Sequence, residues 1–216
     1  MVPDWCRSIR SQLDANPPHW FAAHQVPPDP KRSSAVLVLF WTDDEGKTRV
    51  ALTERAHHLR SHAAQVVFPG GHVDPGETPV QTALRESWEE IGVEPETVEV
   101  IDTLPAVYLS PTGTAYVPVL GWWHRPHPVG VRDPDEVRRV LLPTIDELID
   151  PARRFTATAP GGYSGSAFFV DDLIVWGVTA YLLEAVLELA GLARPWDASV
   201  IHPLPYRLLA AYAMEL

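Results

Sequence analysis

The segment from Thr78 to Gly92 specifies a helix at both of its ends, and this constrains the fold more than any other stretch of the chain. Thr78, followed by Pro79 and then by Gln81, has the pattern of a capping box with proline at the first helical position. Gly92 suits the left-handed conformation that ends many helices. The sequence therefore predicts a short amphipathic helix over residues 79–91, which must pack one face against the rest of the chain.

This helix carries three glutamates, Glu86, Glu89 and Glu90, at spacings that bring like charges together. A helical wheel predicts that they share one face, opposite an apolar side formed by Val80, Leu84, Ser87 and Ile91. Each like-charge pair costs the helix about 0.2–0.5 kcal/mol. Such a cluster is typical of a solvated face, but it also suits a divalent cation, because Mg²⁺ and Mn²⁺ prefer carboxylate oxygen.

The surroundings of the cluster favour the cation. Arg85 lies four residues before Glu89 and can orient its carboxylate. The sequence "PGG" that ends at Gly71 allows backbone carbonyls to approach a metal closely. We therefore interpret the glutamates as a metal site rather than a solvated surface.

The rest of the chain alternates between predicted strands and predicted helices, without a repeat. The predicted strands, alone or in hairpins, are residues 34–42, 48–55, 98–109, 115–123 and 165–177. Apolar residues recur at helical spacing over 178–192, where Gly191 is expected to end the helix, and a short helix is expected over 144–149. This order predicts an α/β (α+β) fold, with a mixed sheet covered by helices.

We divide the 216 residues into one domain and two flanking segments. Residues 1–32 are expected to form an N-terminal proline-rich arm, residues 33–193 the domain, and residues 194–216 a C-terminal helical extension packed on it. The apolar face of the last helix could also be an interface, which leaves a homodimer open.

Composition limits the classes of partner. A net charge of −11 argues against nucleic acid as a partner, because binding to its phosphates requires clustered lysine and arginine. The lone Cys6 allows no intrachain disulfide, which suits a reducing compartment. No stretch has the length of a membrane span or of a signal peptide core. We therefore expect a cytoplasmic protein with no membrane partner.

The segment from Gly71 to Val93 resembles the Nudix box, G-x5-E-x7-R-E-U-x-E-E-x-G-U, in which U is apolar. The matching residues are Gly71, Glu77, Arg85, Glu86, Glu89, Glu90, Gly92 and Val93. Ser87 departs from the pattern, since it stands where the box has an apolar residue. The resemblance implies an α/β/α sandwich around a mixed sheet, and hydrolysis of a nucleoside diphosphate linked to another group.

The resemblance also implies roles for the residues that match. Glu86, Glu89 and Glu90 would be catalytic residues and ligands of Mg²⁺ or Mn²⁺, with the Gly71 carbonyl as a further ligand. Arg85 would join this catalytic set and, with Glu77 and Gly92, fix the loop and the helix (these three residues would be structural supports). The implied reaction is metal-assisted attack of water on a diphosphate phosphorus, in which Glu86 could also act as general base.

The preceding segment, "LTERAHHLRSHAAQVVFPGG", resembles the signature of the coenzyme A pyrophosphatase branch, L-L-T-x-R-[SA]-x3-R-x3-G-x3-F-P-G-G. The matching residues are Leu52, Thr53, Arg55, Ala56, Arg60, Phe68, Pro69, Gly70 and Gly71. Ala64 replaces the signature's glycine. This resemblance implies a nucleotide substrate, coenzyme A or acyl-CoA, which is split into 3′,5′-ADP and a phosphopantetheine fragment. Another nucleoside diphosphate derivative, such as ADP-ribose, a dinucleotide or a nucleoside triphosphate, stays open, as does a non-catalytic sensing module.

Residues of this signature are the candidate substrate contacts. Arg55 and Arg60 would bind phosphate, because a guanidinium matches phosphate oxygens, although they could instead form surface ion pairs. The other candidates are His62, Phe68 and Gly70. His58 and His62 have a zinc-binding spacing but lack a third ligand nearby in sequence, which favours a polar or substrate-facing role. Glu136 is the candidate for an additional acid near the site, with an exposed loop acid as the alternative.

Overall fold

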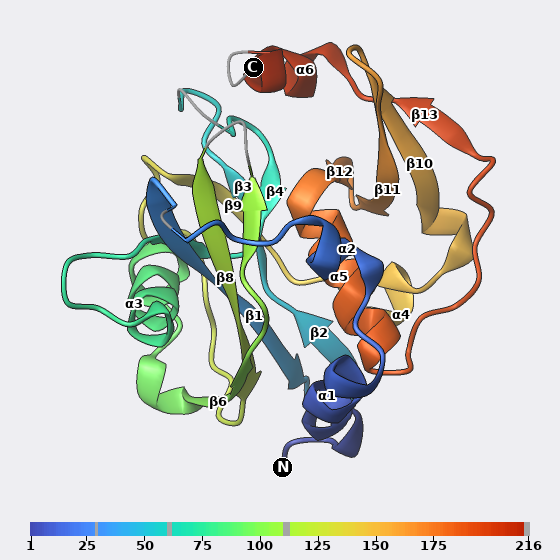
Figure 1. Ribbon diagram of the computed structural model, residues 1–216. Helices are drawn as coiled ribbons and strands as arrows, with labels where there is room; N and C mark the ends of the chain where they lie inside the picture. Colours follow the sequence, from blue (N-terminus) through green and yellow to red (C-terminus); the bar gives the residue numbers. More distant parts are fainter. Residues whose placement is uncertain (29, 60–61, 110–112, 214–216) are drawn as a thin grey trace.

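The computed structural model describes residues 1–28, 30–59, 62–109 and 113–213 (Figure 1). Its central sheet has six strands built around a parallel pair, β1 and β8. On one side β1 pairs with β2 and β5, and on the other side β8 pairs with β6 and β7, all antiparallel. The strands are β1 (Arg32–Thr42), β2 (Thr48–Val50), β5 (Gly70–His72), β6 (Val98–Thr103), β7 (Val107–Leu109) and β8 (Thr114–Trp123).

Two smaller sheets flank the central one. The first contains β4 (Val66–Val67), β3 (Leu52–Arg55) and β9 (Val137–Leu141), in that order. The second contains β12 (Leu173–Val175), β11 (Tyr163–Val170), β10 (Arg154–Ala159) and β13 (Ile201–Pro203). The helices are α1 (Asp4–Ala15), α2 (His19–Ala23), α3 (Pro79–Ile91), α4 (Ile145–Leu148), α5 (Gly177–Leu189) and α6 (Tyr206–Ala213), with single 3₁₀ turns at η1 (Pro95–Thr97) and η2 (Pro151–Arg153).

Strand β1 is buried on both faces, which explains its continuous apolar sequence. Ala35, Leu37 and Leu39 pack with α3 on one side of the sheet, while Val38 and Phe40 join the core formed with α1 and α5 on the other. Figure 1 shows α3 and α5 on opposite sides of this sheet, with β10 and β11 beyond α5. The expected α/β/α sandwich around a mixed sheet is therefore confirmed.

Helix α3 begins and ends where the sequence predicts. The Thr78 hydroxyl accepts the Gln81 N–H, and the Gln81 side chain accepts the Thr78 N–H, so that both halves of the capping box form. Gly92 has a φ of 84°, and its N–H bonds back to the last turn. Ser87 is fully buried, and its hydroxyl donates to the Ala83 carbonyl at 2.7 Å, so the helix itself satisfies the polar group that replaces an apolar residue.

The segment 48–55 is two strands rather than the one expected from its alternating pattern. β2 pairs with β1 in the predicted hairpin, while β3 belongs to the β4-β3-β9 sheet. The change of partner occurs at Ala51, whose N–H still bonds to the Leu39 carbonyl. Local alternation predicted extended backbone here, but the partner of each strand depends on distant segments.

Both terminal segments are integrated into the packing. The α1 residues Cys6, Ile9 and Leu13 are buried in the same core as α5. At the other end, β13 adds a parallel strand to β10, and Leu204 and Leu208 pack with residues of β10 and β11. The boundaries at residues 32 and 193 stay a prediction from the sequence, because both terminal segments pack against the predicted domain. No helix in the described ranges is long and apolar enough to cross a bilayer.

Candidate active site

Arg85 holds the loop before α3 against the helix. Its guanidinium donates from Nε and Nη2 to the two oxygens of Glu77, at 2.8 and 3.0 Å, and from Nη2 to the His72 carbonyl at 3.3 Å. The Arg85 and Thr82 hydrogen bonds lower the pKa of Glu77 to about 2. Glu77 is therefore a carboxylate at neutral pH, and this paired carboxylate ties the 73–78 loop to α3.

Glu90 is almost completely buried, with 2% of its surface exposed. Its Oε2 accepts the Gly70 N–H at 3.1 Å, whereas its buried Oε1 has no hydrogen-bond partner among the described residues. Arg55 is a cation close to this carboxylate, with Nη1 at 3.9 Å from Oε1. Burial raises the pKa of Glu90 to about 8, against the opposing effect of Arg55. An incompletely partnered carboxylate in this position is what a bound cation would satisfy.

Glu86 lies directly against β5. A Cβ on Gly71 would overlap the Glu86 carboxylate, so glycine is required here to admit the acid. Glu86 is partly buried, with 16% of its side chain exposed, and its Oε1 is 3.0 Å from Nη1 of Arg85. Burial raises the pKa of Glu86, while Arg85 opposes the shift. The Gly71 position and Glu86 therefore form one unit of the site.

The three glutamates do not share one environment, and the expected division of α3 into an acidic face and an apolar face is wrong for Glu90. Glu90 lies three positions after Ser87, which places the two about 60° apart around the helix, so both are buried. Glu89 has 45% of its side chain exposed and pairs with Nη1 of Arg85 at 2.9 Å. Solvent exposure in the cluster therefore increases from buried Glu90 through Glu86 to exposed Glu89.

Arg55, at the end of β3, faces two acids across the site. Its Nη2 is 3.8 Å from Oε2 of Glu136, in addition to its contact with Glu90. Its own Nε is buried and has no hydrogen-bond partner in the described part of the chain. Glu136, half exposed, thus lies near the candidate metal ligands as the sequence predicted. This guanidinium retains donor capacity that a phosphate oxygen could use.

A cavity of about 550 Å³ opens beside these residues and is lined by α3, β1, β5, β8 and the start of α5. The predicted site residues that line it are Arg55, His62, Phe68, Gly70, Gly71, Arg85, Glu86 and Glu136. Glu89 and Glu90 do not line it. Arg60 falls outside the described residues.

The wall of this cavity that is formed by β1, β7, β8 and the start of α5 is not predicted by the sequence patterns. Its residues include Arg32, Ser34, Val36, Val107, Tyr116, Trp176, Thr179 and Leu182. The alternation of Arg32, Ser34 and Val36 along β1 is the one local signal that they share a face. That this face meets the start of α5 depends on packing between segments more than a hundred residues apart.

Ala64, at the glycine position of the signature, adopts the conformation that glycine would favour. Its φ is 58°, close to the 54° of His62, which makes these two of three described non-glycine residues with positive φ. A non-glycine residue in this conformation costs roughly 1–2 kcal/mol. The backbone of the signature loop is thus compatible with alanine, at the expense of strain.

The residues present fit a divalent cation by the chemistry of their donors. Carboxylate oxygens from Glu86 and Glu90 lie beside the glycines of β5, and one Glu90 oxygen has no hydrogen-bond partner in the part of the chain that the structure describes. Within the described ranges, however, no three histidine, cysteine, aspartate or glutamate side chains converge tightly enough to form a closed metal site. An open, oxygen-rich arrangement is the kind that Mg²⁺ uses, since this ion retains waters and shares substrate phosphates. His58 and His62 likewise belong to no such group.

Comparison with known proteins identifies the family. The NUDIX domain model matches residues 31–159. Nudix hydrolase 3 of Caenorhabditis elegans is 36% identical over 180 residues, covering 74% of each chain. The uncharacterized Nudix hydrolase NudL of Salmonella paratyphi B is 52% identical over 137 residues, covering 62% of this chain and 70% of that protein.

Solved structures show the same fold. A NUDIX hydrolase from Nitrosomonas europaea has a TM-score of 0.52 at 17% identity, covering 82% of this chain and 81% of its own. A MutT/nudix family protein from Enterococcus faecalis has a TM-score of 0.51 at 16% identity, covering 87% and 74%. The family match over residues 31–159 and the 36% identity to Nudix hydrolase 3 show that the chain belongs to the NUDIX family. It is a Nudix hydrolase that acts on a diphosphate bond, and Nudix hydrolases generally use divalent metal ions.

Proposed function

We propose that this enzyme hydrolyses the diphosphate of coenzyme A or acyl-CoA, giving 3′,5′-ADP and (acyl)phosphopantetheine. The observation that carries the proposal is the single cavity in which Arg55 and Phe68, from the coenzyme A signature, lie together with Gly71 and Glu86 from the Nudix box. The two segments meet at Gly71, but Arg55 and Glu86 are 31 residues apart in sequence. Their convergence supports a substrate that is read by the signature and cleaved beside α3.

The shape and chemistry of the cavity suit a nucleotide with a long second group. One end carries Glu86, Glu136 and Arg55, while the wall beyond them includes apolar side chains of β1, β7 and α5, such as Val36, Val107 and Leu182. A diphosphate would occupy the charged end, with the base or the pantetheine chain along the apolar wall. This separation of charged and apolar surface is consistent with a CoA-like molecule.

In the proposed mechanism the charged residues hold the metal ion, bind phosphate, accept a proton or orient one another. A bound Mg²⁺ or Mn²⁺ would neutralise phosphate charge and lower the pKa of the attacking water. Glu86, Glu89 and Glu90, with the Gly71 carbonyl, would hold this ion, and Glu86 could accept the proton of the water. Arg55 would bind a phosphate oxygen, and Arg85 would keep Glu86 and Glu89 oriented through the contacts described above. The water oxygen bonds to phosphorus as the bridging P–O bond breaks.

A substrate panel with product identification tests the proposal. The purified protein, with Mg²⁺ or Mn²⁺, should convert coenzyme A to 3′,5′-ADP and phosphopantetheine, identified by mass. Preferential cleavage of ADP-ribose, a dinucleotide or a nucleoside triphosphate, with coenzyme A spared, would replace the proposed substrate by that compound. Tight binding of coenzyme A without cleavage of any diphosphate would instead favour a sensing module.

A further inference from the structure

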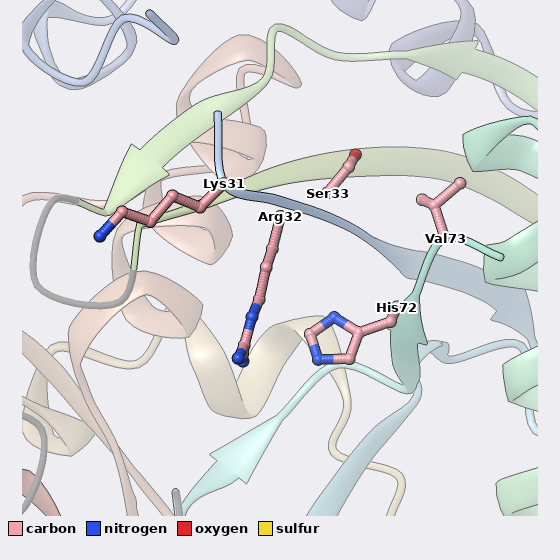
Figure 2. A pocket seen from close by; sticks show the side chains of 5 residues that line it. All are labelled: Lys31, Arg32, Ser33, His72 and Val73. Carbon is pink, nitrogen blue, oxygen red and sulfur yellow. The ribbon is translucent and has the colours of Figure 1, made fainter. Parts of the chain in front are cut away.

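A second hollow adjoins the cavity at the start of β1. It has a volume of about 530 Å³ and is lined by Lys31, Arg32, Ser33, His72 and Val73. Figure 2 shows Arg32 and His72 extending to one side of the strands, while Ser33 and Val73 extend to the other. Arg32 and His72 also line the larger cavity, so the two hollows share a border.

Lys31 and Arg32 are unusual among the basic residues of this acidic protein. Both are exposed, and neither makes an ion pair or a side-chain hydrogen bond within the described ranges. By contrast, Arg49 on β2 and Arg55 on β3 each face a carboxylate. With 28 acidic residues against 17 basic ones, acids are abundant, so two adjacent cations without one form a local site of positive charge.

The positions of these cations are defined by the sheet. The Arg32 N–H donates to the Gly113 carbonyl at 3.3 Å, and the stem of Lys31 would contact any Cβ placed on Gly113. Ser34 lies two residues after Arg32 on β1. Its hydroxyl is 2.9 Å from Nδ1 of His72, and this contact links β1 to β5 beside the same cavity. The cations therefore project from paired backbone and not from a free loop.

The two adjoining hollows thus differ in charge: the larger one contains acidic residues, and the smaller one contains basic residues. The acids Glu86 and Glu136 lie in the larger cavity, which also has an apolar wall. Arg32 lies at its border with the smaller hollow and Lys31 lies in the smaller one, and neither has an acidic partner among the described residues. A cation held by the acids would bind the diphosphate that is cleaved. Glu136 is paired with Arg55, and Glu86 is paired with Arg85. Lys31 and Arg32 would therefore be free to attract a different anionic group of the ligand.

We propose that Lys31 and Arg32 form a second anion subsite, which binds a phosphomonoester carried by the nucleotide apart from the diphosphate that is hydrolysed. The inference rests on the proposed function, because coenzyme A carries such a group, the 3′-phosphate of its ribose. The subsite would distinguish 3′-phosphorylated nucleotides from unphosphorylated ones. Arg32 and Lys31 are then specificity determinants, separate from the residues that perform hydrolysis.

Calorimetric titration with 3′,5′-ADP and with 5′-AMP, which differ by one phosphate, tests the subsite directly. The wild-type protein in Mg²⁺ should bind 3′,5′-ADP about tenfold more tightly, since hydrogen bonds to charged groups contribute on this scale. The ratio should fall toward one in the Lys31→Ala/Arg32→Ala variant and be largely retained in Arg32→Lys. Lys47→Ala, which removes an exposed charge in the turn at the other end of β1, should keep the wild-type ratio.

Two results would overturn the subsite: equal affinities in the wild type, or a ratio that survives in the double alanine variant whose unfolding temperature is unchanged. Turnover of coenzyme A and of 3′-dephospho-CoA separates this inference from the proposed function. Cleavage of both with equal KM would remove the subsite and keep the function. Selective binding of 3′,5′-ADP with neither CoA compound cleaved would keep the subsite and remove the function.

Discussion

At the scale of single residues, three glutamates of one helix have three different surroundings. Glu90 is buried, and one of its oxygens has no partner within residues 1–28, 30–59, 62–109 and 113–213. Glu86 lies against Gly71 of β5, and Glu89 is exposed and paired with Arg85. A buried acid that lacks a partner destabilises the fold unless something positive joins it. Stability and metal binding should therefore be linked at Glu90.

We expect Glu90→Gln to reduce turnover by at least about 10²-fold while the protein stays folded, because the amide can still accept the Gly70 N–H but is a poor ligand for a hard cation. Binding of Mg²⁺ to the native state should raise the unfolding temperature of the wild type and leave that of the variant nearly unchanged. Thermal unfolding with and without Mg²⁺, beside turnover, measures both effects. Glu94→Gln, an exposed acid beyond the helix, is the matched control, and wild-type turnover in Glu90→Gln would contradict the assignment.

Adjacent glycines should respond differently to the same methyl group. A Cβ on Gly70 would strike the Ala35 carbonyl in the neighbouring strand, whereas a Cβ on Gly71 meets the end of the Glu86 side chain, which can move. Gly70→Ala is thus expected to lower the free energy of unfolding by more than about 2 kcal/mol, since the backbone must shift. Gly71→Ala should unfold close to the wild type but lose most of its turnover. Urea denaturation measures the stability of both variants, and a kinetic assay measures their turnover. A fully active Gly71→Ala would show that the observed position of Glu86 is not needed for catalysis.

At the scale of elements, α3 is defined largely by its own ends, whereas the strands around it are defined by their partners. The capping box and Gly92 act within a few residues, so that the helix is specified locally. The segment 48–55 divides between two sheets because Ala51 is the point at which its neighbour changes from β1 to β9. Nothing within that segment marks the break.

Removal of the helix cap gives a test at this scale. Thr78→Ala should lower the free energy of unfolding by about 1 kcal/mol, because the Gln81 N–H loses its acceptor. Thr78→Ser retains the hydroxyl and should restore most of that stability. Urea denaturation of the three proteins measures the difference, and an alanine variant as stable as the wild type would mean that packing alone fixes the start of α3.

At the scale of the whole molecule, the first helix is part of the main core although it lies before the matched NUDIX segment. Ile9 is completely buried among residues of the central sheet and α5, and the Arg10 guanidinium binds the Asp102 carboxylate on β6. Trp5 packs edge-on against Phe40 of β1, with ring centroids 5.5 Å apart. The N-terminal segment is therefore expected to contribute to global stability.

We expect Ile9→Ala to lower the free energy of unfolding by about 2–5 kcal/mol, as for other large core residues truncated to alanine. Arg7→Ala, on the exposed side of the same helix, should cost less than about 1 kcal/mol because its ion pair with Glu99 is solvated. Chemical denaturation compares the two. Similar small losses would indicate that α1 is a separable arm, as its position in the sequence first suggests.

The sequence by itself determined the features that depend on neighbours along the chain. These are the ends of α3, the apolar two-faced strand β1, the hairpin between β1 and β2, and the identity of the acids on α3. Each rests on hydrogen bonds or side-chain periodicity within a few residues, which a sequence states directly.

The tertiary structure decided which of those groups meet and which are removed from water. It buried Glu90, gave Ala64 a positive φ, and placed Arg32 and the start of α5 on the cavity beside Glu86. Sheet pairing and packing join segments that are distant in sequence, and the environment of a charge depends on everything that surrounds it in space. Local sequence patterns do not specify those surroundings. They therefore identified the acids on α3 but did not predict that Glu90 is buried.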